Sequence, residues 1–203
     1  MSVGSTSSAW EARDKGELLH AIVMKVPQAI KVLSGRRKTE ALSRYAREAL
    51  TQSARYKGVV LGALEKGEKG EPLPSNGVHW SLAHTTEQVA AVTAPFSIGI
   101  DTEIVGSFSD DVKAKVATQK EWELAEEVDS HLFFRYWTAK EAVLKAVGEG
   151  LGGLERCRVE EILDDLHLLL EFGSKRWMVS HFFKDSHISS ITVAANDVLW
   201  HSE

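Results

Sequence analysis

The stretch Ile98-Gly99-Ile100-Asp101-Thr102-Glu103-Ile104 decides the fold, because its side chains alternate between two faces as in a β-strand. Asp101 and Glu103 are two residues apart and therefore project from the same face of that strand. Adjacent carboxylates repel each other, and a hard cation such as Mg²⁺ relieves the repulsion. The pattern predicts half of a metal site, and the alternative is a solvated strand end with two surface acids.

The rest of the chain divides into strand-like and helix-like segments on either side of this stretch. Upstream, we predict strands at residues 18–26, 59–64, 78–82 and 89–93, a helix at 40–54 and a surface loop at 65–77. Downstream, we predict helices at 111–128 and 131–147, the second ended by Gly148 and Gly150, and strands at 166–172, 176–183 and 188–194. The three strands between residues 78 and 104 are expected to pair antiparallel around the loops at His84 and Pro95. This order favours an α+β class.

The length of the chain permits one core or two small lobes with a shared interface, since 43% of its 203 residues are hydrophobic. Each half holds a helix and a few strands, which suggests an internal duplication. We therefore predict an N-terminal lobe at residues 1–97 and a C-terminal lobe at 98–203 that act as one functional unit. Residues 1–9 are small and polar and are expected to form a frayed terminus.

The composition excludes several classes of partner. A formal net charge of -5 disfavours general affinity for nucleic acid or an anionic membrane, so any anionic ligand must be bound locally. Cys157 is the only cysteine and cannot form an internal disulfide, and no window resembles a signal sequence or a membrane span. We therefore expect a cytoplasmic protein.

Two further patterns carry candidate functional groups. Trp137, Glu141 and Lys145 recur every four residues in the predicted helix and share one face, although Glu141 and Lys145 also fit an ordinary surface ion pair. His84 and Thr85 place an imidazole beside a hydroxyl at the end of a predicted strand, and the alternative there is a structural histidine.

Residues 99–103, Gly-Ile-Asp-Thr-Glu, and residues 137–145, Trp-Thr-Ala-Lys-Glu-Ala-Val-Leu-Lys, resemble two motifs of the 4′-phosphopantetheinyl transferase superfamily. The family motifs are Gly-Ile-Asp-x-Glu and Trp-x-x-Lys-Glu-Ala-x-x-Lys. Residues 117–122 and 148–151 support the likeness, and the basic residues 36–50 resemble a helix of the long, monomeric members that activate siderophore and antibiotic synthetases. The resemblance implies a pseudo-twofold α+β fold in which coenzyme A lies between two similar lobes of a monomer.

The resemblance also implies an activity, the Mg²⁺-dependent transfer of 4′-phosphopantetheine from coenzyme A to a serine of an apo carrier protein. The carrier would be an acyl, peptidyl or aryl carrier domain, and 3′,5′-ADP would be released, as by a holo-[acyl-carrier-protein] synthase. Two alternatives stay open. One is a degenerate member that binds coenzyme A or a carrier protein without transfer, and the other is an unrelated Mg²⁺-dependent phosphohydrolase.

The same resemblance assigns roles to individual residues. The implied metal ligands are Asp101, Glu103 and Glu141. The implied contacts with coenzyme A are His84, Thr85, Lys140 and Lys145, with Arg37 and Arg44 at the ribose 3′-phosphate. Lys145 would also stabilise charge on the leaving phosphate, and the general base would be Glu141 or Glu121. Many relatives carry a serine where this chain has Ala83, so one phosphate hydrogen bond is absent.

Overall fold

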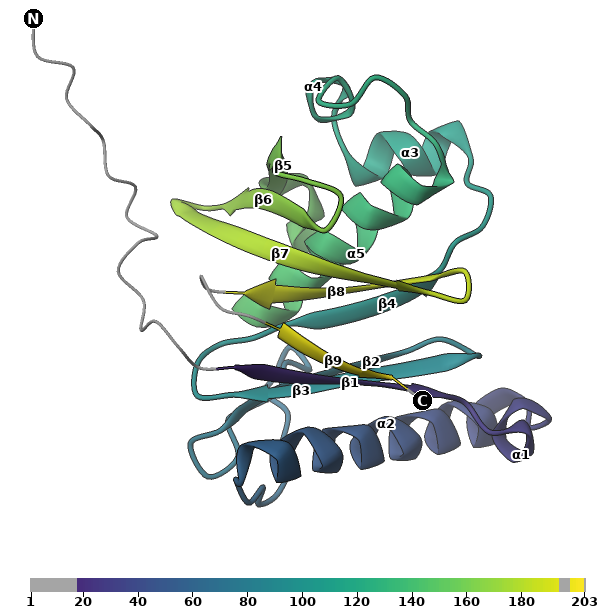
Figure 1. Cartoon of the computed structure of the whole chain (residues 1–203), viewed down its shortest axis with the longest axis vertical. Helices are drawn as coiled ribbons and strands as arrows, with labels where there is room; N and C mark the ends of the chain where they lie inside the picture. The colour runs from purple at the N-terminus through teal and green to yellow at the C-terminus, as the bar shows by residue number, and fades with distance from the viewer. Residues whose placement is uncertain (1–17, 194–197, 203) are drawn as a thin grey trace, which may run out of the picture.

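The computed structural model describes residues 18–193 and 198–202, and it forms four layers in the order helix, sheet, sheet, helix (Figure 1). The predicted α+β class is therefore confirmed. The terminus predicted at residues 1–9 lies outside the described residues. No described helix has both the length and the apolar character that a membrane crossing requires.

The first sheet has the strand order β2-β3-β1-β9. Its members are β1 (Leu19–Lys25), β2 (His79–His84), β3 (Gln88–Ala94) and β9 (Val198–Ser202). All pairings are antiparallel except that of β1 with β9, which is parallel. The short helix α1 (Gln28–Lys31) and the long helix α2 (Gly35–Lys57) follow β1, and α2 covers the outer face of this sheet (Figure 1).

The second sheet is antiparallel throughout, with the order β4-β8-β7-β6-β5. Its strands are β4 (Ile100–Ile104), β5 (Cys157–Ile162), β6 (His167–Phe172), β7 (Lys175–Lys184) and β8 (His187–Val193). The helices after β4 are α3 (Asp110–Val116), α4 (Gln119–Trp122), α5 (Ser130–Val147) and the 3-10 helix η1 (Leu151–Arg156). The long helix α5 covers the outer face of the second sheet.

Side-chain alternation along the strands explains the layering. In β1, Ala21 and Val23 face the second sheet, whereas Ile22 and Met24 face α2. Both faces of the strand are therefore buried, as its continuous apolar run indicates. The layer between the two sheets is apolar at its centre, where β1 and β3 meet Ile191 and its neighbours in the second sheet.

The edge of that layer is polar. The buried Gln88 side chain of β3 donates hydrogen bonds from Nε2 to Thr102 Oγ1 of β4 at 2.8 Å and to Ser189 Oγ of β8 at 3.1 Å. Ser81 Oγ of β2 accepts a hydrogen bond from the Ile100 backbone N–H at 3.1 Å. These directional bonds fix how the two sheets lie on each other, which apolar contacts alone do not.

The two halves repeat one arrangement. In the first, β1, α2, β2 and β3 give the strand order β2-β3-β1, and in the second, β4, α5, β7 and β8 give the order β7-β8-β4. In each half the last strand lies between the other two. This correspondence supports the internal duplication that the sequence suggested.

Several boundaries differ from the sequence-based expectation. Residues 59–64 form no strand, because the chain leaves α2 through the left-handed Gly58 (φ 67°) and Val60 stays 79% exposed. The helix predicted at 111–128 is broken at Ala117, whose backbone is extended, and Thr118 starts α4 with a capping box. Helix α5 ends at Gly148 (φ 71°), and Gly150 has an ordinary negative φ.

Strand pairing also differs. Strand β4 pairs with β8 and not with β3, so the predicted antiparallel succession holds only for β2 and β3. Strands β5 and β9 were not predicted. Strand β9 pairs with β1, so residues 198–202 complete the first sheet and not the predicted C-terminal lobe. The His20 and His201 rings hydrogen-bond at 2.9 Å, which fastens β9 to β1.

Candidate functional site

Gly99 lets helix α5 approach the start of β4 more closely than any other residue would. A Cβ atom at this position would lie 1.8 Å from the Ala142 carbonyl oxygen. The close approach brings Glu141 and Lys145 of α5 to Asp101 of β4. Asp101 and Lys145, 44 positions apart in the sequence, thus meet at one end of the helix–sheet interface.

Lys145 provides the positive charge of this cluster. Its Nζ donates to Asp101 Oδ1 at 2.7 Å and to the Ile100 carbonyl oxygen at 3.1 Å. Asp101 Oδ2 and Glu141 Oε1 are buried, and neither has a hydrogen-bond partner among the described residues. Buried carboxylate oxygens are normally paired, so these two unpaired oxygens are free to accept a cation or a donor group.

The electrostatics of the three acids lead to the same conclusion. Burial raises the pKa of Asp101, and the ammonium of Lys145 only partly opposes the effect. Burial and the charge of Asp101 raise the pKa of Glu141. Burial, followed by the charge of Asp101, raises the pKa of Glu103 to about 7 even though the Trp137 indole donates to its carboxylate. The cluster holds more negative charge than Lys145 can balance.

These residues fit a hard divalent cation, which takes carboxylate oxygens as ligands and keeps several waters. In residues 18–193 and 198–202, however, no three acidic, histidine or cysteine side chains already converge at coordinating positions. Lys145 takes one oxygen of Asp101 in the structure as it stands. Asp101, Glu103 and Glu141 are thus brought together as predicted, and their role as metal ligands stays a prediction.

Glu121 and Lys140 form a separate buried ion pair. Their side chains meet at 2.6 Å, and Lys140 Nζ also donates to the Val116 carbonyl oxygen at 2.7 Å. Glu121 accepts further hydrogen bonds from Thr118 and from the Val159 backbone N–H. Burial acts to raise the pKa of Glu121, but the hydrogen bond and charge of Lys140 lower it overall.

This pair is engaged in holding α4, α5 and β5 together. Lys140 is only 1% exposed, so it presents no donor to a ligand in this structure. The geometry therefore favours a structural role over the predicted phosphate contact of Lys140 and over the predicted base role of Glu121. No local pattern indicated this pairing, because both residues lie in segments that also carry the likeness to the family.

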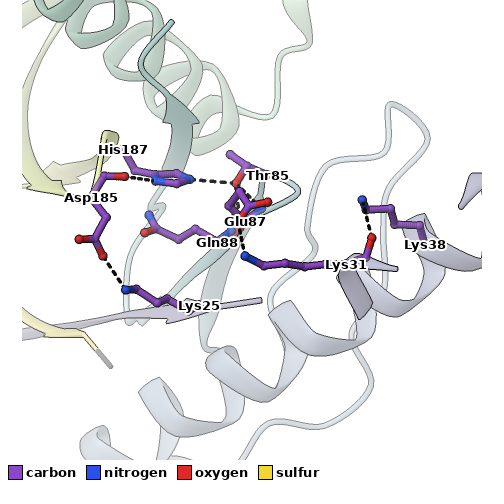
Figure 2. Close-up of polar contacts among 8 residues, drawn as sticks. All are labelled: Lys25, Lys31, Lys38, Thr85, Glu87, Gln88, Asp185 and His187. Carbon is purple, nitrogen blue, oxygen red and sulfur yellow. Dashed lines mark hydrogen bonds and ion pairs between the residues drawn. The ribbon is translucent and has the colours of Figure 1, made fainter. Parts of the chain in front are cut away.

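His84 and Thr85 lie at the turn between β2 and β3. Partial burial and the positive charge of Lys145 lower the pKa of His84, so its imidazole lies within electrostatic reach of the acidic cluster. Thr85 has a structural role, since its Oγ1 accepts from the backbone N–H groups of Glu87 and Gln88 and lies 3.3 Å from His187 Nε2 (Figure 2).

Three lysines surround this turn (Figure 2). Lys25 pairs with Asp185 at 2.8 Å, Lys31 pairs with Glu87, and Lys38 donates to the Lys31 carbonyl oxygen at 3.1 Å. Lys31 therefore fastens the turn to α1, and Lys25 joins β1 to the turn between β7 and β8. Such partly exposed pairs contribute little stability individually and can exchange partners.

Arg37 and Arg44 are not brought to the acidic cluster. Both are exposed on α2, and this helix lies on the face of the first sheet that is turned away from the second (Figure 1). Their predicted contact with a ribose phosphate stays a prediction.

A pocket adjoins Lys145 at the C-terminal end of α5. Pro72 of the 65–77 loop, Trp80 of β2, Ile98 and Gly148 help to line it, so both halves of the chain contribute walls. Apolar walls beside a cation suit an organic molecule with an anionic group. Pro72, Trp80 and Ile98 were not predictable as site residues, because only the fold brings them to Lys145.

The fold and the site define a class, a two-lobed α+β protein with three carboxylates and a lysine gathered on β4 and α5. Residues 97–191 match the model of the 4′-phosphopantetheinyl transferase superfamily. The match to this superfamily includes both motifs and every member of the acidic cluster.

Individual relatives agree with this assignment. The 4′-phosphopantetheinyl transferase HetI of a Nostoc species is 34% identical over 97 residues, which are 44% of this chain and 41% of that protein. The 4′-phosphopantetheinyl transferase gsp of Aneurinibacillus migulanus is 28% identical over 90 residues, 42% of this chain and 38% of that protein. The L-aminoadipate-semialdehyde dehydrogenase-phosphopantetheinyl transferase of Xenopus laevis is 24% identical over 169 residues, 68% of this chain and 56% of that protein. The chain thus spans between 38% and 56% of the length of these relatives.

Proposed function

We propose that this protein transfers 4′-phosphopantetheine from coenzyme A to a serine of an apo carrier protein in a Mg²⁺-dependent reaction that releases 3′,5′-ADP. The observation that carries the proposal is the cluster of Asp101, Glu103, Glu141 and Lys145, built on the two motifs of the superfamily. An acyl, peptidyl or aryl carrier domain is the proposed acceptor. A cytoplasmic location and a monomeric state remain predictions of the sequence.

Asp101, Glu103 and Glu141 would hold Mg²⁺, which when bound offsets the charge of a pyrophosphate and polarises its phosphorus. Lys145 lies 2.7 Å from Asp101 and supplies a second cation where the leaving 3′,5′-ADP phosphate gains charge. The lowered pKa of His84 keeps its imidazole neutral near pH 7, so it would bind phosphate as a hydrogen-bond donor. The pocket beside Lys145 would take an organic part of coenzyme A.

The proposed step is a displacement at phosphorus. The serine Oγ forms a bond to the phosphorus that carries pantetheine, the bond from that phosphorus to the oxygen of 3′,5′-ADP breaks, and the serine proton passes to a base. Glu141 has a buried oxygen without a partner, whereas the oxygens of Glu121 accept hydrogen bonds or ion pairs from three other residues. This difference supports Glu141 as the base.

The test is to incubate the full chain with coenzyme A, Mg²⁺ and a panel of apo acyl, peptidyl and aryl carrier proteins, and to weigh the carriers by mass spectrometry. A mass gain of one phosphopantetheine on any carrier is the expected result. Unchanged carriers with intact coenzyme A would identify a binding protein, and cleaved coenzyme A with unchanged carriers would identify a phosphohydrolase.

Two variants make this test specific to the site. Glu141→Gln removes the charge of the proposed ligand and base with little change in shape, and we expect it to lose most transfer. Glu155→Gln, at an exposed position in η1, is the matched control and should transfer normally. Equal activity of the two variants would remove Glu141 from the mechanism.

A further inference from the structure

Three buried polar side chains form a continuous hydrogen-bonded chain beneath the acidic cluster. His181 Nδ1 of β7 lies 2.8 Å from Ser190 Oγ of β8, and Ser190 Oγ lies 2.6 Å from Thr138 Oγ1 of α5. All three residues are between 0% and 2% exposed. Sequence reasoning gave none of them a role.

The number of available protons determines which group donates in each hydrogen bond of this chain. Thr138 has one hydroxyl proton and donates it to the Phe134 carbonyl oxygen at 2.7 Å, so Ser190 must donate to Thr138. Ser190 then has no proton left and must accept from His181 Nδ1–H. His181 Nε2, which has no partner among the residues that the structure describes, is left as an unpaired acceptor. The reverse order would bury an unpaired N–H donor, which is rarer.

The imidazole at the start of the chain stays neutral, since burial and the charge of Arg135 hold the pKa of His181 well below its usual value. A neutral chain with one direction has a single low-energy arrangement. It can therefore fix the position of a helix on a sheet, and apolar packing alone leaves more freedom to slide.

The hydrogen-bonded chain has one member on α5, the helix that carries Glu141, and one on β8, the strand that pairs with the Asp101 strand β4. Thr138 precedes Glu141 by three residues on α5, so the two side chains leave the helix about one turn apart. Ser190 lies directly opposite Asp101 in the pairing of β8 with β4, and cross-strand partners project from the same face. Each end of the acidic cluster thus has a chain member beside it.

We propose that His181, Ser190 and Thr138 act as positioning residues that set the spacing between Glu141 and Asp101, and so the affinity of the site for a divalent cation. They touch neither substrate nor ion and act through the placement of α5 on β4. The inference rests on the proposed function, because it assumes that the acidic cluster binds a cation.

The N-terminal half of the protein offers a matched control. Ser53 Oγ of α2 lies 3.0 Å from Thr93 Oγ1 of β3, a buried hydroxyl pair that also joins the long helix to the central strand of its half. Ser53 also donates to the His20 carbonyl oxygen and accepts from the Thr93 backbone N–H. Neither residue lies on an element that carries Asp101, Glu103 or Glu141. Thr93→Val and Thr138→Val therefore each remove one hydroxyl from a buried pair that joins a long helix to the central strand of its half.

The experiment measures binding of Mn²⁺ to the full chain by calorimetry in the presence of coenzyme A, together with the melting temperature of each variant. We expect Thr138→Val to bind Mn²⁺ at least about 10-fold more weakly, as found for groups that orient metal ligands. Thr138→Ser, which keeps the hydroxyl, should bind as the unmodified chain does. Thr93→Val should lower the melting temperature and leave Mn²⁺ binding unchanged.

Ser190→Ala removes the middle member of the hydrogen-bonded chain without added bulk. It provides a second test of the inference if Thr138→Val does not fold. It too should weaken Mn²⁺ binding, and the Mg²⁺ concentration for half-maximal transfer should rise more than the turnover number falls. Unchanged Mn²⁺ binding in the folded Thr138→Val or Ser190→Ala protein overturns this inference and leaves the proposed metal site standing. An unmodified chain that binds no Mn²⁺ overturns the proposed metal site and this inference with it.

Discussion

Replacement of Gly99 by alanine should separate helix α5 from β4 and disable the acidic cluster. The added Cβ would lie 1.8 Å from the Ala142 carbonyl oxygen and 2.8 Å from the Ala142 carbonyl carbon and the Ala146 nitrogen. All three are backbone atoms, so no side chain can rotate away. Since Cβ contacts below 3.0 Å essentially do not occur, the gap must open by at least the difference between 3.0 Å and 1.8 Å.

The effect on function should exceed the effect on stability. Overpacking of this kind costs about 1–3 kcal/mol, which lowers the melting temperature by about 2–4 °C for each kcal/mol in a chain of this size. A displacement of about 1 Å at a reacting centre costs about 100-fold in rate. We therefore expect Gly99→Ala to stay folded at 25 °C and to lose about two orders of magnitude in kcat/KM for transfer.

The assay is steady-state transfer to a carrier that the unmodified chain accepts, with a thermal melt of the same preparation. Gly152→Ala is the control, because nothing lies within 4 Å of the position its Cβ would take and its φ is not positive. A Gly99→Ala protein with unmodified kcat/KM and melting temperature would refute the claim that close helix approach builds the site.

Two further predictions concern the charge of Glu103 and the polar contacts between the two sheets. Glu103 has a pKa raised from 4.5 to about 7, so folding favours its protonated form, and the metal-free protein should lose stability as the pH rises from 4.5 to about 7. Melting temperatures across that range should fall less in Glu103→Gln than in the unmodified chain, and equal slopes would contradict the burial of this carboxyl. Gln88→Leu leaves Thr102 and Ser189 without their shared donor and should lower the free energy of unfolding in urea by about 1–3 kcal/mol. A change near zero would show that these bonds do not determine how the two sheets pack.

Features set by local sequence were predictable. The alternation at residues 98–104 placed a strand and two carboxylates on one face, and the spacing of Trp137, Glu141 and Lys145 placed three side chains on one face of a helix. In both segments, the spacing of apolar residues and the residues that end the element lie close together in the sequence. The cluster they form together was inferred from the family resemblance, since nothing local links β4 to α5.

Features set by distant contacts were not predictable. Glu121 and Lys140 have the residue types of an active site, yet each is the buried partner of the other because α4 folds back on α5. The apolar run at residues 59–64 has the composition of a strand, but it pairs with none of the strands that the structure describes. Thr118 ended the predicted long helix through a capping box, a signal that the apolar periodicity outweighed.

The pairing of β9 with β1 has a consequence for how the molecule is made. On the ribosome, the first sheet emerges early, but the strand that covers its β1 edge is translated about 170 residues after β1 itself. Until then β1 presents an unpaired edge to other chains. The first half is therefore not a module that recombination can exchange by itself, because its β1 edge is covered only by residues 198–202, and fragments that stop at residue 193 should aggregate during synthesis.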